Sequence, residues 1–475
     1  MSKIHGMMDV GKRSMMNSQT ALQTAGHNIA NKSTEGFSRQ RVEIQAADPV
    51  GYGKLRIGTG SKTAKVTRIN NPYLEKQIGK ETASRGFYQG QADALTRVEQ
   101  VYNEQVNKGL NGLVNDMFNA FREFSNNPES MATRTMVKES AENLAKDFNR
   151  VVNQLGEIQR DVDIQVQTCV NDINEMCREV AILNEKIAFQ QMQDGPANDE
   201  RDRRDVLVKK IGEKVNIRWG EGKDGMVTIT AGNTALLVAG VEAKKLSLAP
   251  TAETETKSAG SYDVFHHNSD QATPHKVTEQ LTGGMIGGLL DVRDKTVIDL
   301  MGQMDRMAFT LSTVVNRVHS QGYDAYSEKG GEFFTTPTQL RHAARDMKVS
   351  EKVAGDVGRL AAGLEPHSPG DNRVAGTLAK LQFEGLFSEG TATVDEFYNS
   401  MVGQVGIQTR AANSSLKTQA DVIAQLNNVR ESISGVSLDE EATKLIEYQK
   451  AFDASARLIR TADEMFDTVL NLKRL

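Results

Sequence analysis

Both ends of the chain carry a helical repeat of apolar residues, and these repeats constrain the fold more than any other feature of the sequence. The N-terminal repeat is the weaker one and alternates steps of four and three through Ile4, Met8, Gly11, Met15, Ser18, Leu22, Ala25 and Ile29. The C-terminal repeat has an apolar residue at every seventh position, at Leu438, Leu445, Phe452, Ile459 and Phe466. A single apolar stripe stabilises a helix only when it is buried, so each repeat needs a partner.

The two repeats are suited to each other. Gly11, Ser18 and Ala25 are small enough for a bulkier helix that carries Phe452 and Phe466 to come close. Phenylalanine fits a two-stranded coiled coil poorly, although an ordinary intramolecular helix pair and a parallel dimer remain alternatives on periodicity alone. The repeats predict that the chain associates with copies and neighbours through its ends. The predicted assembly interface consists of Ile4, Met8, Met15, Leu22, Ile29, Leu438, Leu445, Phe452, Ile459 and Phe466.

The sequence also specifies the start of the C-terminal helix. Ser437 and Glu440 have the spacing of a capping box, in which the hydroxyl and the carboxylate each accept a backbone N–H of the first turn. A helix from Leu438 to Leu470 would be about 50 Å long. We therefore expect one long helix that begins at the cap.

The interior predicts long helices that surround a small β unit. Apolar seams run from Val137 to Ile187, with a change of period at Ile158–Val162–Val166, and from Leu290 to Val318. Further helices are expected over Tyr73 to Phe124, interrupted by Gly86, Gly109 and Gly112, and over Glu396 to Glu431. Together these segments predict a bundle that is built from distant parts of the chain.

The period changes to two in the middle of the chain. Val215, Ile217 and Trp219 alternate with polar residues, and Asp224–Gly225 is a hairpin signal. The polar stretch from Pro250 to Lys276 is typical of an exposed loop, and residues 333–387 are irregular. The sequence thus predicts a small antiparallel β unit.

The predicted fold class is α+β, mainly α, with terminal helices that form a coiled coil. Three parts are expected: a terminal coiled-coil domain (1–40 with 435–475), a helical bundle domain with irregular or β segments (41–212 with 284–434) and a small β-rich outer domain (213–283).

Composition excludes several partners. The formal net charge of −5 and the lack of a dense Lys/Arg block argue against nucleic acid. No apolar run reaches membrane-spanning length, and the N-terminus lacks the layout of a secretory signal. The two cysteines, Cys169 and Cys177, lie too far apart along one helix for a disulfide.

The residues that could carry chemistry give no catalytic, cofactor-binding or metal site. The Gly283–Gly284 and Gly287–Gly288 pairs lack the lysine of a phosphate loop, so they indicate a helix-entry turn. His266, His267 and His275 lack metal-ligand spacing and are expected to be surface histidines. The mixed-charge run from residue 199 to 205 is interpreted as a solvated helix start. We therefore expect neither an enzyme nor a bound cofactor.

A motif directly after the N-terminal repeat is more specific. Residues 26–42 read Gly-His-Asn-Ile-Ala-Asn-Lys-Ser-Thr-Glu-Gly-Phe-Ser-Arg-Gln-Arg-Val. This run resembles the N-terminal signature of the bacterial flagellar rod, hook and hook-associated axial proteins. Glu35 replaces the family's proline and Phe37 its tyrosine, so the loop loses a fixed φ and a hydroxyl. The matching motif residues are Asn28, Ile29, Ala30, Asn31, Gly36, Phe37, Ser38 and Arg39.

The far end of the chain resembles the C-terminal signature of the same superfamily, over Gly435–Glu441, Leu445–Phe452 and Thr461–Thr468. Within the superfamily, three features favour the hook-associated protein 1 family, the first hook–filament junction proteins. These features are the run Ser38–Val42, the stretch Gly58–Gly60 and the long helical seam from Val137 to Ile187.

The resemblance implies a structural subunit of the flagellum that joins the hook to the filament. It implies type III export without a cleaved signal peptide, an extracellular location, and terminal segments that stay unfolded until assembly. The implied partners are copies of the chain in a helical ring, the hook protein, the second hook–filament junction protein and a flagellar export chaperone. Nucleic acid and membrane are not expected as partners. A hook or distal rod subunit, an axial protein with a muramidase-like domain and a non-flagellar coiled-coil scaffold remain alternatives.

Overall fold

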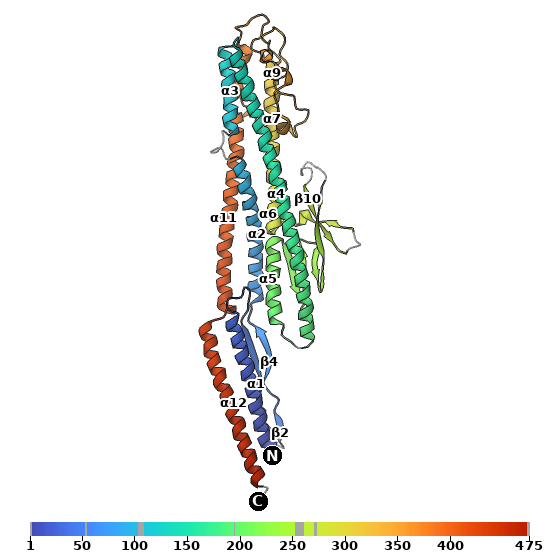
Figure 1. The fold of residues 1–475 in the computed structure, drawn as a ribbon, viewed down its shortest axis with the longest axis vertical. Helices are drawn as coiled ribbons and strands as arrows, with labels where there is room; N and C mark the ends of the chain where they lie inside the picture. The colour runs from blue at the N-terminus through green and yellow to red at the C-terminus, as the bar shows by residue number, and fades with distance from the viewer. Residues whose placement is uncertain are drawn as a thin grey trace.

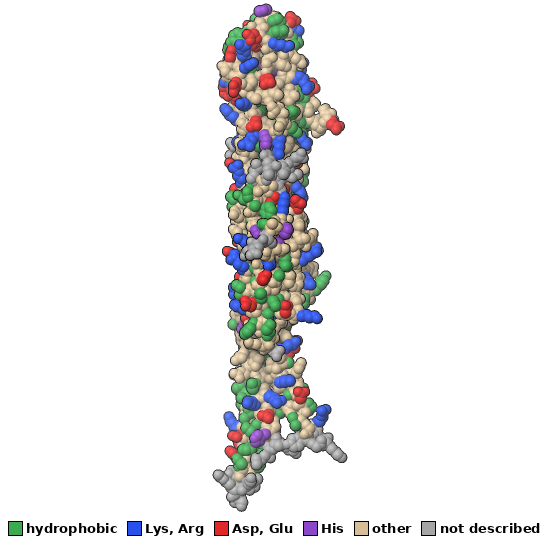
Figure 2. All heavy atoms as spheres, turned by 90° about the vertical axis from the view of Figure 1, so that its right-hand side faces the viewer, with side chains coloured by type: hydrophobic (Ala, Val, Ile, Leu, Met, Phe, Trp, Pro, Cys, Tyr) green, Lys and Arg blue, Asp and Glu red, His purple; other side chains and the backbone are tan. Residues whose placement is uncertain are grey.

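The computed structural model describes residues 2–52, 55–102, 109–193, 195–251, 261–269 and 273–472. They form a long, narrow rod with both chain ends at one pole and a small β unit on one side (Figures 1 and 2). The predicted mainly helical α+β class is confirmed. The long helices are α1 (Ser2–Ala30), α2 (Pro72–Val101), α3 (Leu110–Asn126), α4 (Met131–Met192), α5 (Asn198–Lys214), α7 (Ile298–His319), α11 (Val394–Ser434) and α12 (Leu438–Leu472).

Helix α4 is the longest element of the rod and contributes to its core along its whole length. It has 62 residues, which corresponds to about 90 Å. Its seam is buried from Val137 through Val162 to Ile187. The expected change of period does not break the helix, because Ile158, Val162 and Val166 are all buried within it.

Two helices occupy the segment from Tyr73 to Phe124, which was predicted to be helical with interruptions at Gly86, Gly109 and Gly112. Helix α2 ends at Val101, and α3 begins after Gly109. Gly86 lies inside α2 and Gly112 lies inside α3, so neither glycine interrupts its helix, contrary to the prediction. A Cβ atom at this position would lie 2.0 Å from the Glu213 carbonyl oxygen of α5, so Gly86 permits a close helix contact.

The second predicted seam forms α6 (Gly284–Asp291), a π-helical stretch η2 (Val292–Val297) and α7 without a gap. Gly283 precedes the first residue of α6, as the helix-entry interpretation predicted, but Gly287 and Gly288 lie inside α6, so that interpretation is wrong for them. Gly288 lies where α6 crosses α2, and a Cβ atom there would lie 2.0 Å from the Phe87 carbonyl oxygen. Glycine is therefore required at this crossing.

Helix α11 returns along α2 and completes the bundle (Figure 1). It begins with a capping box: the Glu396 N–H donates to Thr393 Oγ1 at 3.3 Å, and the Thr393 N–H donates to Glu396 Oε2 at 2.9 Å. This cap was not predicted, although its Thr-x-x-Glu spacing is a known signal. The cap predicted at Ser437 and Glu440 is not formed among the described residues, where Glu440 Oε2 accepts instead from Arg39 Nη2 at 2.7 Å.

The β unit consists of two antiparallel sheets beside α4. One sheet has the order β5-β6-β7-β8 and the other β11-β10-β9. The predicted hairpin turn is present at Gly225, where φ is +73°. The strands are β5 (Ile217–Glu221), β6 (Val227–Ala231), β7 (Ala235–Ala239), β8 (Glu242–Ala243), β9 (Lys245–Pro250), β10 (Tyr262–His267) and β11 (His275–Lys276).

The stretch that was predicted as a polar loop, Pro250 to Lys276, contains strand β10. Residues 252–260 and 270–272 of this stretch lie outside the described residues. The surface interpretation of His266 is wrong, because the side chain is buried and its Nε2 lies 2.7 Å from the Leu236 carbonyl oxygen. Strand β10 pairs with β9, and this pairing places it in the sheet. The polarity of the local sequence does not predict such a pairing.

The pole of the rod opposite the chain ends is made of short helices and turns (Figure 1). They pack around Phe333 and Phe334, which are fully buried. This region includes the segment that the sequence described only as irregular. Its elements are α8 (Ala343–Asp346), α9 (Glu351–Gly355), η3 (Val357–Arg359), α10 (Arg373–Lys380), η4 (Leu381–Phe383) and η5 (Ser388–Gly390).

A β ribbon follows α1 and lies along it. Strands β1 (Gln40–Ala46) and β4 (Ser61–Arg68) pair antiparallel, and β2 (Val50–Tyr52) and β3 (Leu55–Ile57) pair beyond them. The sequence grouped residues from 41 onward with the bundle. In the structure, residues 40–68 instead extend the layer formed by the terminal helices (Figure 1).

Candidate assembly site at the terminal helices

Helices α1 and α12 pack against each other as an antiparallel pair at one pole of the rod (Figure 1). Close approach depends on small residues. A Cβ atom at Gly11 would lie 2.7 Å from Ile459 Cγ1, and Ser455 Oγ donates a hydrogen bond to Ser14 Oγ at 2.7 Å. Nearer the free end of the pair, the rings of His5 and Phe466 meet edge to face at 5.5 Å.

The two predicted seams therefore face each other within one chain, but they do not bury each other completely. Of the ten predicted interface residues, nine are half-buried, and Leu438 is 43% exposed. Ile446 and Met465 of α12 are also exposed, at 60% and 45%. The helix pair thus leaves apolar surface available to another molecule, while its use in assembly remains a prediction.

The β ribbon packs on another side of α1, where Asn17 holds it in place. The Asn17 amide donates to the Ser61 carbonyl oxygen at 3.0 Å, and its Oδ1 accepts the Thr63 N–H at 2.8 Å. Arg13 donates to the Thr59 carbonyl oxygen at 3.3 Å. These polar contacts were not predicted, because strand pairing between β1 and β4 was not expected from the sequence.

Asn28 of the signature motif connects three segments. Its amide nitrogen donates to the Gln40 carbonyl oxygen at 2.9 Å and to Glu441 Oε2 at 3.0 Å, and its Oδ1 accepts the Gln40 N–H at 2.9 Å. The side chain is buried. Asn31 acts locally, since its amide donates to the His27 carbonyl oxygen at the end of α1 at 3.0 Å. Ile29 is half-buried and Ala30 is exposed.

The Gly-Phe pair shapes the loop after α1. Gly36 has φ of +81°, and a Cβ atom there would lie 2.1 Å from Val206 Cγ2 of α5. The Phe37 ring meets the His27 ring edge to face at 5.5 Å, so the aromatic residue holds the loop against α1. Arg430 of α11 donates to the Gly36 carbonyl oxygen at 3.0 Å. Loop, bundle and terminal helix therefore meet at this point.

Arg39 ties the signature loop to the start of α12. Its Nε donates to Glu441 Oε1 at 2.9 Å, and its Nη2 lies 2.7 Å from Glu440 Oε2. Burial raises the pKa of Glu441, but the hydrogen bonds from Asn28 and Arg39 outweigh it, so the pKa lies below its ordinary value. Glu441 is thus held as a carboxylate between two motif residues.

Asp202 of α5 anchors the same loop to the bundle. Its Oδ2 accepts the Ser38 N–H at 2.8 Å, and its Oδ1 lies 2.7 Å from Arg68 Nη1 at the end of the ribbon. Burial raises the pKa of Asp202 even though Arg68 and Ser38 favour the carboxylate. The interpretation of the 199–205 run as solvated is therefore wrong for Asp202, and also for Arg204, which is fully buried. Asp202 faces partners more than 130 residues away, whereas Arg204 donates to the Gly225 carbonyl oxygen at 2.6 Å, 21 residues away.

We expect Asp202→Ala to loosen the joint between the terminal helices and the bundle. Removal of one partner from a buried ion pair costs about 3 kcal/mol, and here the Ser38 N–H also loses its acceptor. Hydrogen exchange of the Arg39 amide, which donates to the Ser434 carbonyl oxygen, should accelerate about 100-fold. Asp205→Ala is the matched control, because Asp205 is more exposed and contacts only Arg68 in this loop-and-ribbon region. An equal effect of both changes would contradict the assignment.

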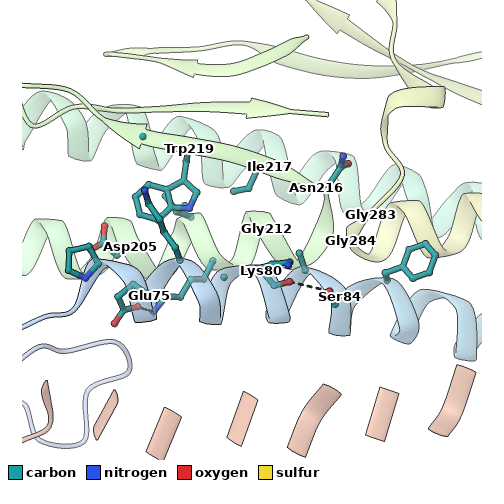
Figure 3. A pocket seen from close by; sticks show the side chains of 18 of the residues that line it. Glu75, Lys80, Ser84, Asp205, Gly212, Asn216, Ile217, Trp219, Gly283 and Gly284 are labelled. Carbon is teal, nitrogen blue, oxygen red and sulfur yellow. Dashed lines mark hydrogen bonds and ion pairs between the residues drawn. The ribbon is translucent and has the colours of Figure 1, made fainter. Parts of the chain in front are cut away.

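The bundle also has a groove of about 700 Å³ between α2, α5 and β5. Trp219 and Ile217 of β5 lie on one side of it, with Glu75, Lys80 and Ser84 of α2 on the other (Figure 3). Its lining residues include no histidine or cysteine, and Glu75 is paired with Arg430 at 2.8 Å. The hydroxyl of Ser84 donates to the Lys80 carbonyl oxygen of its own helix at 3.3 Å and to no side-chain base.

The other described residues provide neither a metal-binding cluster nor a reactive thiol. Within the ranges given above, no group of three His, Cys, Asp or Glu side chains could hold a metal ion. Burial raises the pKa of the Cys177 thiol to about 12, which keeps it protonated and unreactive. None of the helices in these ranges has the length and apolarity that a bilayer span requires.

The fold and the terminal site together define an elongated structural protein whose two chain ends form one association surface. Comparison with family models agrees with this class. The model of the flagellar hook-associated protein FlgK helical domain matches residues 95–334, and that of the flagellar basal body rod FlgEFG protein C-terminal region matches residues 430–472. The chain belongs to the flagellar hook-associated protein FlgK family and is a structural protein of the flagellum.

Whole-chain relatives extend the match. Flagellar hook-associated protein 1 of Bacillus subtilis is 28% identical over 498 residues, covering 98% of this chain and 97% of the relative. Flagellar hook-associated protein 1 of Salmonella typhimurium is 24% identical over 546 residues, covering 96% and 97%. The structure of the flagellar hook junction protein FlgK from Burkholderia pseudomallei shares the fold, with a TM-score of 0.68 and 13% identity over 75% of this chain and all of that one.

Proposed function

We propose that this protein joins the flagellar hook to the filament and that it assembles in a helical ring through its terminal helices. The observation that carries the proposal is the α1–α12 pair at one pole, whose apolar seams are only half-buried within one chain. A half-covered seam gains free energy when a neighbouring copy covers it. The whole-chain similarity to hook-associated protein 1 supports the place of this ring in the flagellum.

Each of the three predicted parts of the chain would form one layer of the assembled tube. Residues 1–40 with 435–475, extended by the ribbon at 40–68, would line the inner tube. The bundle, which was expected to comprise residues 41–212 with 284–434, would form the next shell, and residues 213–283 the outer one. Such a layer would match a flexible hook to a stiffer filament.

The proposed partners are further copies of the chain, the hook protein, the second hook–filament junction protein and a flagellar export chaperone. A 30% identity to the flagellar hook protein FlgE of Treponema pallidum over 37% of this chain supports relatedness to hook components. We also propose an extracellular location that is reached without a cleaved signal peptide, and a role without catalysis. The assembly interface remains the ten seam residues of α1 and α12 that were predicted from the sequence.

Deletion of the gene tests the proposal. Source cells without this protein should have hooks of normal length, no filaments, and flagellin monomers in the medium, because the filament would have no base on which to grow. Electron microscopy of the cells and an immunoblot of the medium measure these outcomes. Complementation with the wild-type gene is the control and should restore filaments.

The other outcomes would reassign the protein. Missing hooks would place the protein nearer the cell along the flagellar axis, as a hook or distal rod subunit. Intact filaments in the deletion strain would contradict a role in the flagellar axis below the filament.

A further inference from the structure

The two edges of the terminal layer carry opposite charge. The basic edge is formed by α1, the following loop and the ribbon. Its exposed charged side chains are Lys12, Arg13, Lys32, Arg41, Arg56, Lys62 and Lys65, against Asp9, Glu35 and Asp48. The acidic edge is α12. Its exposed charged side chains are Asp439, Glu440, Glu447, Asp453, Asp463, Glu464 and Asp467, against Lys450, Arg457 and Arg460.

The edges also lie apart from each other in space. Helix α12 and the ribbon pack on different sides of α1, so α1 is the middle element of the layer (Figure 1). Figure 2 views the molecule from the ribbon side, and near its lower end basic and hydrophobic side chains lie together with fewer acidic ones. One copy therefore presents its acidic edge on one side and its basic edge on the other.

Most of these charges are not used within the chain. Among the described residues, the carboxylates of Glu447, Asp453 and Glu464 have no ion-pair or hydrogen-bond partner, and neither do the side chains of Arg41 and Lys62. A surface that has unpaired charges of predominantly one sign attracts a surface of the opposite sign. The charges are thus available to a second molecule.

Each edge also exposes apolar side chains. On the ribbon, Ile44, Val50 and Ile57 are 50%, 54% and 44% exposed. On α12, Ile446 and Met465 are 60% and 45% exposed. Apolar contact supplies binding free energy and the charges select the partner, a combination typical of protein interfaces.

We propose that the acidic edge of one copy docks on the basic edge of the next copy, so that neighbouring chains lie side by side. This inference rests on the proposed function, in which copies assemble through their terminal layer. The two edges are different surfaces, so the contact is heterologous and continues from copy to copy around a ring or helix. A symmetric contact of α12 with α12 would place acidic side chains against acidic side chains and is disfavoured.

Charge reversal tests the proposal in cells that lack the gene. The acidic-edge variant carries Glu447→Lys, Asp453→Lys and Glu464→Lys, and the basic-edge variant carries Arg41→Glu, Arg56→Glu and Lys62→Glu. Each variant alone should reduce the fraction of hooks with filaments at least tenfold. Reversal of both edges in one chain should restore that fraction to within twofold of wild type, because the attraction is re-formed with its signs exchanged. Co-expression of the two single-edge variants should also restore it.

A matched control reverses three exposed acidic residues of α4 instead, with Glu157→Lys, Glu175→Lys and Glu185→Lys. This variant should keep its filaments. Export is followed by immunoblot and folding by circular dichroism of the purified chains. The proposal is wrong if a single-edge variant keeps its filaments, or if the double reversal, exported and folded, restores no more than the single reversals. Failure of the wild-type gene to restore filaments would instead refute the proposed function.

Zero-length cross-linking tests the contact independently of the flagellum. A 1:1 mixture of ¹⁴N- and ¹⁵N-labelled full-length wild-type chains is treated with a carbodiimide, which joins carboxylates to lysines in contact. Peptides that join one copy's α12 to Lys12, Lys62 or Lys65 of another copy are expected at low ionic strength and should decrease at least fivefold in 1 M salt. Cross-links between copies that lie only elsewhere would overturn the proposal.

Discussion

Replacement of Phe452 and Phe466 by aspartate is expected to leave a folded, soluble bundle that no longer supports a filament. Both side chains lie in the α12 seam, where they are half-buried, and the Phe466 ring contacts His5 of α1. Full burial of such a side chain contributes about 1.5–3 kcal/mol, and a carboxylate in its place has to be desolvated. The bundle core contains neither residue, so its stability should be unchanged.

Three measurements check this prediction: filament counts in cells that express only the variant, circular dichroism of the purified chain, and its urea midpoint. Phe383→Asp is the matched control, because this phenylalanine lies at the opposite pole and is 72% exposed. The control should behave as wild type. Normal motility of the Phe452→Asp, Phe466→Asp variant would refute the interface assignment.

Gly288→Val is expected to cause a large loss of stability in the bundle. A Cβ atom at Gly288 would lie 2.0 Å from the Phe87 carbonyl oxygen and 3.0 Å from the Gln91 backbone nitrogen of α2. Both neighbours are backbone atoms of a packed helix and cannot rotate away, so α2 and α6 have to separate. Overpacking of this kind costs about 3 kcal/mol in the free energy of unfolding.

Gly302→Ala is the matched control in α7. Nothing lies within 4 Å of a Cβ atom at that position, so alanine should be neutral or stabilise the helix by up to about 1 kcal/mol. Urea unfolding followed by circular dichroism compares the two variants. Equal midpoints for Gly288→Val and wild type would show that the crossing tolerates a side chain.

Sequence periodicity predicted the long helices well, because a buried face repeats along the chain and is visible locally. The seam of α4, the continuous segment from α6 to α7 and the paired ends of the chain follow from such repeats. The role of Gly11 was also predicted correctly, since a small residue is required where Ile459 of α12 comes close. These features depend on near neighbours or on one repeating stripe.

Other features depend on partners that the sequence cannot identify. Asp202 is surrounded by charged neighbours in the sequence, but its actual partners are Ser38 and Arg68, more than 130 residues away. A glycine within a helical pattern predicts an interruption of the helix. Glycine is instead required at position 86 because the Glu213 carbonyl oxygen of another helix lies close to it. The β ribbon was likewise missed, because its short strands are stabilised by α1 rather than by a strong alternation of their own.

The pairing of α1 with α12 also determines the order in which the molecule can fold. Ser14 and Ser455, which share a hydrogen bond, are separated by 441 residues. Contacts between neighbouring segments, such as those of α3 with α4, require only a short stretch of chain and form early. Helix α1 cannot pair with α12 until the bundle residues that lie between them in the sequence have been synthesised. The association surface is consequently completed only after the chain of the bundle is available to fold.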